Sequence, residues 1–201
     1  MDDTLRDALA TVEPFAQFNP KDLAVERLGG LTNINYRVNS PAGDFVLRLA
    51  GEGTGDYIDR VAEEKNAQVA SDAGVNAEII FFDANSGTMV TRYIENAVTL
   101  DIEKFKDKGV LERAGRAFRQ LHDSPQPFEG EFELFEQIDQ YLAVLDQLNA
   151  DLPDGYSDVH DNAKSVRAAL SSYPLPKRPC HCDPMVENCI DDGDRVFIID
   201  F

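Results

Sequence analysis

Three polar side chains near the end of the sequence stand at spacings that could support chemistry. Asp183 opens a loop, Asn188 follows five residues later, and Asp200 comes after a predicted hairpin turn at residues 191–194. Transfer of a phosphoryl group needs an acceptor for the proton of the attacking hydroxyl and ligands that hold Mg²⁺ against a triphosphate. An aspartate suits the first task, and carboxylate and amide oxygens suit a hard cation. We therefore predict metal-assisted phosphoryl transfer, with Asp183 as the base and Asn188 and Asp200 as metal ligands.

The same segment resembles the catalytic motif of the choline kinase and aminoglycoside phosphotransferase superfamily. That motif has His, any residue, Asp, any four residues and Asn, followed after a hairpin by Ile-Asp and then Phe or Trp. The stretch from His181 to Asn188 and the Ile-Asp-Phe that ends at Phe201 match it. The resemblance implies a protein-kinase-like fold, ATP as the phosphoryl donor and Mg²⁺ as a cofactor. In this motif the histidine more often supports the loop than acts as a base, so we expect a structural role for His181.

A glycine-rich segment near the N-terminus resembles the nucleotide loop of choline-kinase-like proteins. It reads Gly-Gly-Leu-Thr-Asn over residues 29–33. Glycines let a backbone approach phosphate oxygens, and free N–H groups and the Thr32 hydroxyl can donate to them. Taken alone, such a segment is more often a tight turn between strands. Because it precedes the rest of the motif in the expected order, we assign Gly30, Thr32 and Asn33 to the nucleotide.

Arg48 stands in a predicted strand, at the position where protein kinases carry a lysine. A guanidinium is always charged and could hold the α- and β-phosphates; an arginine that faces solvent is the alternative. Residues 59–63 resemble the start of the family's helix that bears the partner glutamate, and both Glu63 and Glu64 are candidates. At 100° per residue the apolar face of that helix centres near Ala62, so Glu63 flanks the face while Glu64 points to solvent. We therefore assign Glu63 to the ion pair.

Apolar periodicity predicts a strand-rich first half and a helical second half. Strands are expected at residues 25–28, 34–38, 45–49, 78–82 and 88–93, helices at 58–73, 111–122, 134–148 and 162–170, and a strand-and-turn segment at 179–201. We expect an α+β, two-lobed fold of the protein-kinase type, with a nucleotide-binding lobe over residues 1–94 and a mainly helical catalytic lobe over 95–201.

The resemblance also implies what lies between the two lobes and beyond the second. Adenine would bind the backbone where the lobes meet, at Tyr93, Ile94 and Glu95. Kinase-like folds place further helices after the position of Phe201, and in choline kinases those helices supply much of the acceptor pocket. We therefore expect the catalytic lobe to be incomplete at its C-terminal end and the sequence to be part of a longer protein.

The composition limits the partners and the compartment. Among 201 residues, 19 are Lys or Arg and 37 are Asp or Glu, for a net charge of −18. Such a chain lacks the basic surface that a polyanion needs, so we expect no nucleic-acid partner. No apolar run approaches the roughly 20 residues that cross a bilayer, and the N-terminus lacks the order of a signal peptide. We expect a cytoplasmic protein with no membrane insertion.

Three cysteines, an odd number, argue against a disulfide framework. A zinc site built from these cysteines and His181 is a rival interpretation. However, Cys-x-Cys lacks the usual gap of two to four residues, and no second Cys/His pair exists elsewhere. We expect Cys180, Cys182 and Cys189 to be small buried apolar residues around the loop.

Together these features predict a kinase that acts on a small cationic alcohol. The negative field would attract such a substrate, and a charged surface that serves solubility is the other explanation of the charge. The glycine-rich loop, Arg48 and the pair Asp59-Arg60 resemble the choline kinase branch, which implies choline or ethanolamine as the acceptor. An aminoglycoside, thiamine or sugar kinase is the alternative among enzymes. A non-catalytic nucleotide-binding protein is the alternative outside them, and the intact base and metal ligands argue against it.

Overall fold

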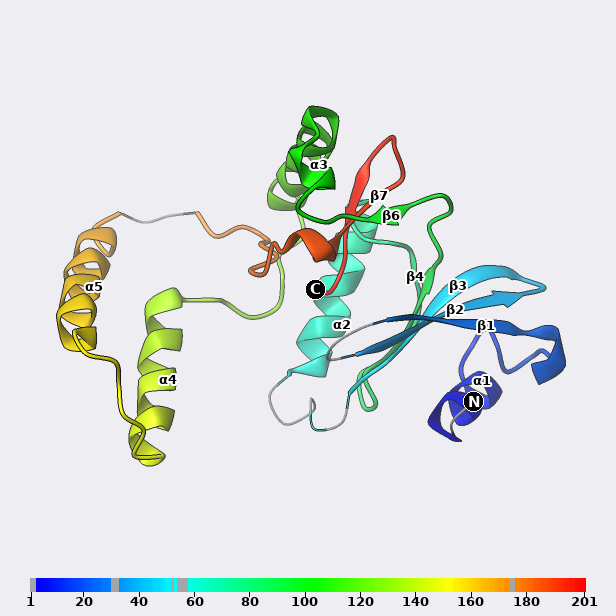
Figure 1. Cartoon of the computed structure of the whole chain (residues 1–201), viewed down its shortest axis with the longest axis horizontal. Helices are drawn as coiled ribbons and strands as arrows, with labels where there is room; N and C mark the ends of the chain where they lie inside the picture. The colour runs from blue at the N-terminus through cyan, green and yellow to red at the C-terminus, as the bar shows by residue number, and fades with distance from the viewer. Residues whose placement is uncertain (1–2, 30–32, 52, 54–57, 174–175) are drawn as a thin grey trace. The chain divides into compact units, whose positions relative to one another are not determined.

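The computed structural model describes residues 3–29, 33–51, 53, 58–173 and 176–201 (Figure 1). The chain forms two compact units, residues 1–129 together with 178–201, and residues 130–177. Every predicted site residue belongs to the first, larger unit. The predicted division into lobes, with its boundary near residues 94–96, stays a prediction.

Five antiparallel strands form the first sheet of the larger unit, in the order β1-β2-β3-β5-β4 (Figure 1). They are β1 (Ala24–Gly29), β2 (Ile34–Ser40), β3 (Gly43–Leu49), β4 (Ile79–Asp83) and β5 (Thr88–Arg92). All five predicted strands are confirmed. In the β2–β3 pairing Tyr36 lies opposite Leu47 and Val38 opposite Phe45. The buried side chains of both strands therefore share one face, which sets the register.

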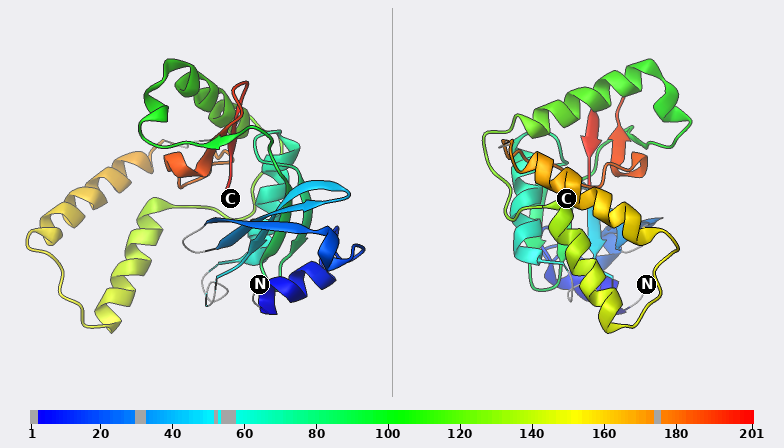
Figure 2. Two further views of the ribbon diagram at one scale, coloured as in Figure 1. Left: turned by 45° about the vertical axis from the view of Figure 1, so that its right-hand side comes forward. Right: turned by 90° about the vertical axis from the view of Figure 1, so that its left-hand side faces the viewer.

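A helix that we did not predict packs on that face of the sheet. α1 spans Asp3–Thr11 and buries Leu5, Ala8 and Leu9. These side chains form one hydrophobic core with the buried residues of β2 and β3. The helix lies beside the first sheet (Figure 2). The missed signal is the spacing of Leu5, Ala8, Leu9 and Val12, which follows the helical repeat of three and four residues.

The opposite face of the sheet carries a charged residue. Leu47 and Leu49 belong to the core beneath α1. Side chains alternate along a strand, so Arg48 between them points to the other face. That face is where α2, which spans Arg60–Asp72, contacts the sheet through β4.

α2 begins where a side chain satisfies its first backbone donors. The Asp59 carboxylate accepts hydrogen bonds from two N–H groups of the first turn, each at 3.1 Å. The buried residues of the helix are Arg60, Glu63, Ala67, Val69 and Ala70. The expected apolar face near Ala62 is therefore wrong, and Val61 beside it is 66% exposed. The periodicity misplaced the face because two of the buried residues are charged, and a pattern of apolar side chains does not register them.

A second core joins α2 to the C-terminal hairpin within the same unit. α3 spans Lys108–His122, and its apolar side packs against β7 (Cys189–Asp191) and β8 (Val196–Ile198). These two strands and β6 (Val98–Thr99) form an antiparallel sheet in the order β6-β7-β8. The predicted hairpin is thus confirmed. Short 3-10 helices cover Pro20–Asp22, Lys104–Lys106 and Val186–Asn188.

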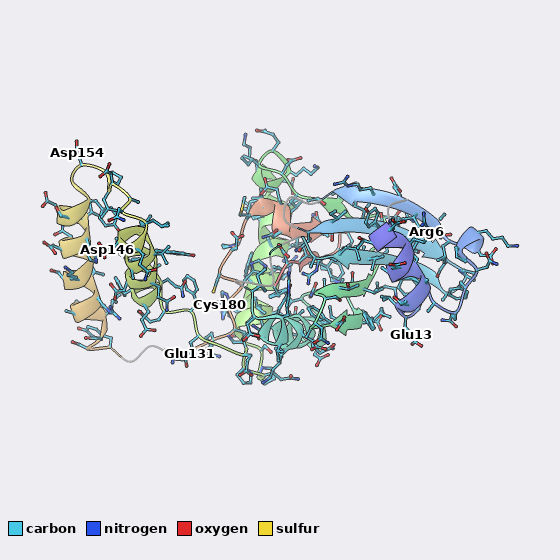
Figure 3. The ribbon with its side chains drawn as sticks, turned by 90° about the horizontal axis from the view of Figure 1, so that it is seen from below. Arg6, Glu13, Glu131, Asp146, Asp154 and Cys180 are labelled. Atoms are coloured by element: carbon cyan, nitrogen blue, oxygen red, sulfur yellow. The ribbon has the colours of Figure 1, made fainter. Side chains whose placement is uncertain are left out.

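The smaller unit contains two helices, α4 (Leu134–Gln147) and α5 (Tyr156–Leu170). α5 begins six residues before the predicted start, directly after Gly155, whose φ of +80° is one that glycine adopts without strain. Both helices are wholly described and neither has a buried residue. Arg167 of α5 lies 2.8 Å from the carboxylate of Asp139 on α4. Acidic side chains such as Asp146 and Asp154 project from this unit (Figure 3).

The α+β fold class is confirmed, with a strand-rich N-terminal region followed by helices. Across the described ranges, no helix is both long enough and apolar enough to span a membrane.

Candidate active site

Arg48 and Glu63 form a buried ion pair between the sheet and α2. Nη2 of Arg48 lies 2.7 Å from Oε1 of Glu63, and the two side chains are 5% and 8% exposed. Glu64 is exposed on the outer side of the same helix. The predicted pairing of Arg48 with Glu63 and not Glu64 is therefore confirmed, although the helical face used to infer it was misplaced. The role of both residues in nucleotide binding stays a prediction.

A third buried charge, which sequence reasoning missed, adjoins this pair. Nη1 of Arg60 lies 2.6 Å from the second carboxylate oxygen of Glu63, Oε2. The sequence contained a usable signal, because residues 60 and 63 are neighbours on a helix surface. In the sequence, Asp59-Arg60 indicated only a family resemblance. Burial of three charges is expensive for folding, so such a cluster is more readily explained by function than by stability.

Asp200 lies beside Arg48 and is exposed to solvent. Its Oδ1 is 3.6 Å from Nη1 of Arg48, and its side chain is 55% exposed. The residue adopts a φ of +67°, a left-handed conformation that costs a non-glycine residue energy and is often kept where function requires it. Arg48 thus links the proposed metal ligand Asp200 to Glu63.

Asn188 is held between the loop of Asp183 and the segment before Asp200. Its side-chain Nδ2 donates to the backbone carbonyl of Asp183 at 3.1 Å. Its backbone carbonyl accepts from the N–H of Ile199 at 2.9 Å. Because the amide nitrogen is used in this way, Oδ1 is the side-chain atom that can face a cation. The Asp183 side chain itself is exposed. Asn188 therefore connects the Asp183 loop, through its side chain, to the residue before Asp200, through its backbone.

His181 connects the same loop to the segment that follows β8. Its Nε2 lies 2.8 Å from the carbonyl of Ile199, to which it can only donate. The ring contacts Phe201 edge-on with centroids 4.8 Å apart, and Phe201 in turn contacts Phe128. Nδ1 is buried with no hydrogen-bond partner among the described residues. A ring fixed on one nitrogen and enclosed on the other suits the expected structural role.

The predicted nucleotide residues on the sheet side are only partly described. Gly30 and Thr32 lie outside the described residues. Asn33 is described, and its Oδ1 is buried with no partner in the described part of the chain. An oxygen left in this state is an acceptor that a bound group could satisfy.

The segment assigned to adenine follows β5. The N–H of Tyr93 donates to the carbonyl of Asp44 at 3.0 Å, and the guanidinium of Arg37 lies 4.1 Å from the centroid of the Tyr93 ring. Ile94 is half-buried and Glu95 is exposed. Tyr93 is thus fixed to the sheet by its backbone and its ring, and the binding of adenine at this segment stays a prediction.

The expectation for the cysteines is wrong for two of the three. Cys189 is buried in the core beneath α3, and burial raises the pKa of its thiol. Cys180 and Cys182 are exposed on the loop that leads to Asp183. The difference arises because Cys189 belongs to a strand with a buried face, whereas the loop residues have no strand alternation to turn them inward.

The sequence and the structure were compared with known proteins. The family model described as choline/ethanolamine kinase matches residues 25–201. A crystal structure of a choline/ethanolamine kinase family protein from Mesorhizobium loti is 46% identical, with a TM-score of 0.85 over 98% of this chain and 63% of that one. Choline kinase LicA from Streptococcus pneumoniae is 30% identical, with a TM-score of 0.71 over 89% of this chain and 62% of that one.

A structure of LicA in complex with AMP is also similar. It is 28% identical, with a TM-score of 0.70 over 92% of this chain and 64% of that one. The chain therefore spans less than two thirds of the length of each of these three proteins.

Proposed function

The chain belongs to the choline/ethanolamine kinase family, and on that premise we propose that the protein transfers the γ-phosphoryl group of ATP to the hydroxyl of an amino alcohol such as choline or ethanolamine. The observation that carries the proposal is the position of Arg48, which contacts Glu63 on one side and Asp200 on the other. A kinase needs a fixed cation beside its metal ligand, because the triphosphate binds both.

The nucleotide would bind in the larger unit, against the face of the first sheet that carries Arg48. Arg48 would hold the α- and β-phosphates, since its guanidinium is permanently charged and rigidly held by Glu63. The unpartnered Oδ1 of Asn33 would accept a hydrogen bond from the nucleotide or from water bound to it. Adenine would lie against the backbone of Tyr93, Ile94 and Glu95. The similar LicA structure in complex with AMP supports a nucleotide as the ligand.

The donor atoms of Asn188 and Asp200 fit Mg²⁺. Both offer oxygen, which a hard cation prefers, and the amide of Asn188 is held so that its oxygen can serve. No group of three or more His, Cys, Asp or Glu side chains in the described residues could hold a metal. Two protein ligands suit Mg²⁺, which usually keeps waters and phosphate oxygens in its shell. When bound, the ion would neutralise charge on the transferring phosphoryl group.

Asp183 would act as the base. The acceptor oxygen bonds to the γ-phosphorus, the bond to the β–γ bridging oxygen breaks, and ADP leaves with that electron pair. The hydroxyl proton passes to the carboxylate of Asp183. The contact of Asn188 with the Asp183 carbonyl and the contact of His181 with Ile199 would hold this loop in place for the transfer.

The acceptor would be a small cationic alcohol. The net charge of −18 favours the approach of a cation, and the names of the similar proteins favour choline or ethanolamine over the other acceptors of this fold. Because ATP is a cytoplasmic cosubstrate, we place the activity in the cytoplasm.

The proposal is tested by ADP release with choline, ethanolamine, thiamine, methylthioribose and kanamycin as acceptors, using the protein at its full natural length. We expect turnover with choline or ethanolamine and none without Mg²⁺ or Mn²⁺. A clear preference for kanamycin would refute the amino alcohol. ATP binding with no metal-dependent consumption of ATP would favour a non-catalytic nucleotide-binding protein.

The role of Asp183 has its own test. Asp183→Asn should reduce turnover by about 10²–10⁴-fold, the usual contribution of a positioned base. ATP affinity should stay within about twofold of the wild type, because Asp183 faces the acceptor. Turnover retained within about tenfold would remove the base from the mechanism.

A further inference from the structure

Two buried arginines from different parts of the chain each contact one oxygen of the Glu63 carboxylate. Oε1 lies 2.7 Å from Arg48 on β3, and Oε2 lies 2.6 Å from Arg60 in the first turn of α2. Arg60 is itself only 8% exposed. The proposed phosphoryl transfer uses Arg48 and Glu63 and gives no role to Arg60.

Arg60 is held against the turn that joins β4 to β5. A Cβ atom added at Gly87 would lie 2.8 Å from Nε and 2.9 Å from Cζ of Arg60. Gly87 also has a φ of +69°, so a side chain is disfavoured there for two reasons. The same residue's carbonyl lies 3.5 Å from Nη2 of Arg48. The turn therefore touches both arginines, and the guanidinium of Arg60 sits in a space that only glycine leaves open.

We propose that Arg60 is a positioning residue for the nucleotide, acting through Glu63. It holds one carboxylate oxygen so that the other is directed at Arg48. This inference rests on the proposed function, since it assigns to Arg60 the orientation of the arginine that binds the phosphates.

The experiment measures the equilibrium dissociation constant for ATP in the wild type and in Arg60→Met, with the thermal midpoint recorded for each. Arg60→Met keeps the length of the side chain and removes its charge. We expect ATP to bind about tenfold more weakly to Arg60→Met, which is an ordinary coupling between adjoining charged groups. Arg60→Lys keeps the positive charge but not the planar guanidinium with its several N–H donors. Its loss of ATP affinity should lie between those of the wild type and Arg60→Met.

The matched control is Arg6→Met. Arg6 is also a helical arginine that pairs with an acidic residue three positions away, Asp3, at 2.8 Å, but its side chain is 59% exposed and it lies on α1 (Figure 3). ATP affinity should be unchanged in this variant. An equal loss in Arg6→Met would show that the effect does not depend on the cluster and would overturn the inference.

A positioning role and a merely structural one differ in the background of Glu63→Gln. If Arg60 acts through Glu63, then Arg60→Met added to Glu63→Gln should weaken ATP binding by less than about twofold more. A full tenfold loss in that background would overturn the inference, as would wild-type affinity in Arg60→Met alone.

A second variant covers the case in which Arg60→Met does not fold. Gly87→Ala keeps all three charged residues and places a Cβ atom within 3 Å of the guanidinium of Arg60 and of the Cβ of Ala50, which crowds Arg60. It should weaken ATP binding as Arg60→Met does, and unchanged affinity in a folded Gly87→Ala protein would count against the inference. Failure of the wild type to bind ATP would instead refute the proposed function.

Discussion

Two carboxylates of the larger unit are each held by arginine, and their oxygens are shared differently. Glu63 is shared by Arg48 and Arg60, with one oxygen for each. Asp191 at the end of β7 contacts one arginine, Arg113 of α3, whose Nε and Nη2 donate to its two oxygens at 2.8 and 2.6 Å. Its Oδ1 also accepts from the N–H of Gly193 at 3.2 Å. Both carboxylates join a helix to a strand. In the first group one carboxylate contacts two arginines, whereas in the second one carboxylate contacts one arginine through two bonds.

The Glu63 group therefore fits a binding site, whereas Arg113 and Asp191 form a structural ion pair. A bidentate pair satisfies both partners, so Arg113 and Asp191 have nothing further to attract and serve to hold the hairpin on α3. In the Glu63 cluster Arg48 is only partly satisfied, with a second nitrogen directed toward Asp200. We therefore expect substitutions in the cluster to affect chemistry and nucleotide binding, and substitutions in the pair to affect stability.

The largest effect should come from substitution of Asp200. Asp200→Ala removes the charged metal ligand, so turnover should fall by at least about 10²-fold and the Mg²⁺ requirement should rise sharply. The measurement is ADP release as a function of Mg²⁺ concentration. Asp194→Ala, an exposed aspartate in the turn of the same hairpin, is the control. An unchanged metal dependence in Asp200→Ala would show that this residue is not a ligand.

Next in size is the effect within the cluster. Arg48→Ala should weaken ATP binding by about 10- to 100-fold, the range for one charge-assisted hydrogen bond. Glu63→Ala should weaken it less, and the double variant should lose less than the sum. Glu64→Ala, on the exposed side of α2, should have no effect. Coupling of Arg48 to Glu64 in this cycle would contradict the observed pairing.

A smaller effect, on stability, is expected from the Arg113–Asp191 pair. Asp191→Ala leaves the guanidinium of Arg113 without its partner and should lower the thermal midpoint by several degrees. The ATP affinity of the folded variant should match that of the wild type. A loss of affinity with no loss of stability would erase the distinction between the two groups.

The smallest effect is a change in pH dependence. The hydrogen bond from Arg113 holds the pKa of the Asp191 carboxyl below its ordinary value of 3.8, against the opposing effect of burial. Because the folded-state pKa is lowered, the pair stabilises the fold fully above that ordinary value. This stabilisation is lost as the pH falls through the lowered pKa. Thermal midpoints measured at acidic pH should fall more steeply in the wild type than in Asp191→Asn. Equal slopes would show that the pair does not carry this dependence.

Local patterns were sufficient where the sequence neighbours themselves form the structure. The five strands of the first sheet and the C-terminal hairpin were predicted correctly because alternation and turn residues are properties of short segments. The order of Asp183, Asn188 and Asp200 was likewise enough to suggest phosphoryl transfer. α1 was not predicted although its spacing carries the helical repeat. A helix of nine residues is stabilised mainly by packing on the sheet, which the sequence alone does not show.

The sequence by itself determined the strands, the fold class and the residue types available for phosphoryl transfer. Only the tertiary structure decided which face of α2 is buried, that Arg60 shares Glu63 with Arg48, and that Cys180 and Cys182 are exposed. Arg48 and Gly87 are 39 residues apart in the chain yet in contact. Periodicity describes how a segment repeats along itself, whereas the placement of buried charges depends on which distant segments pack against it.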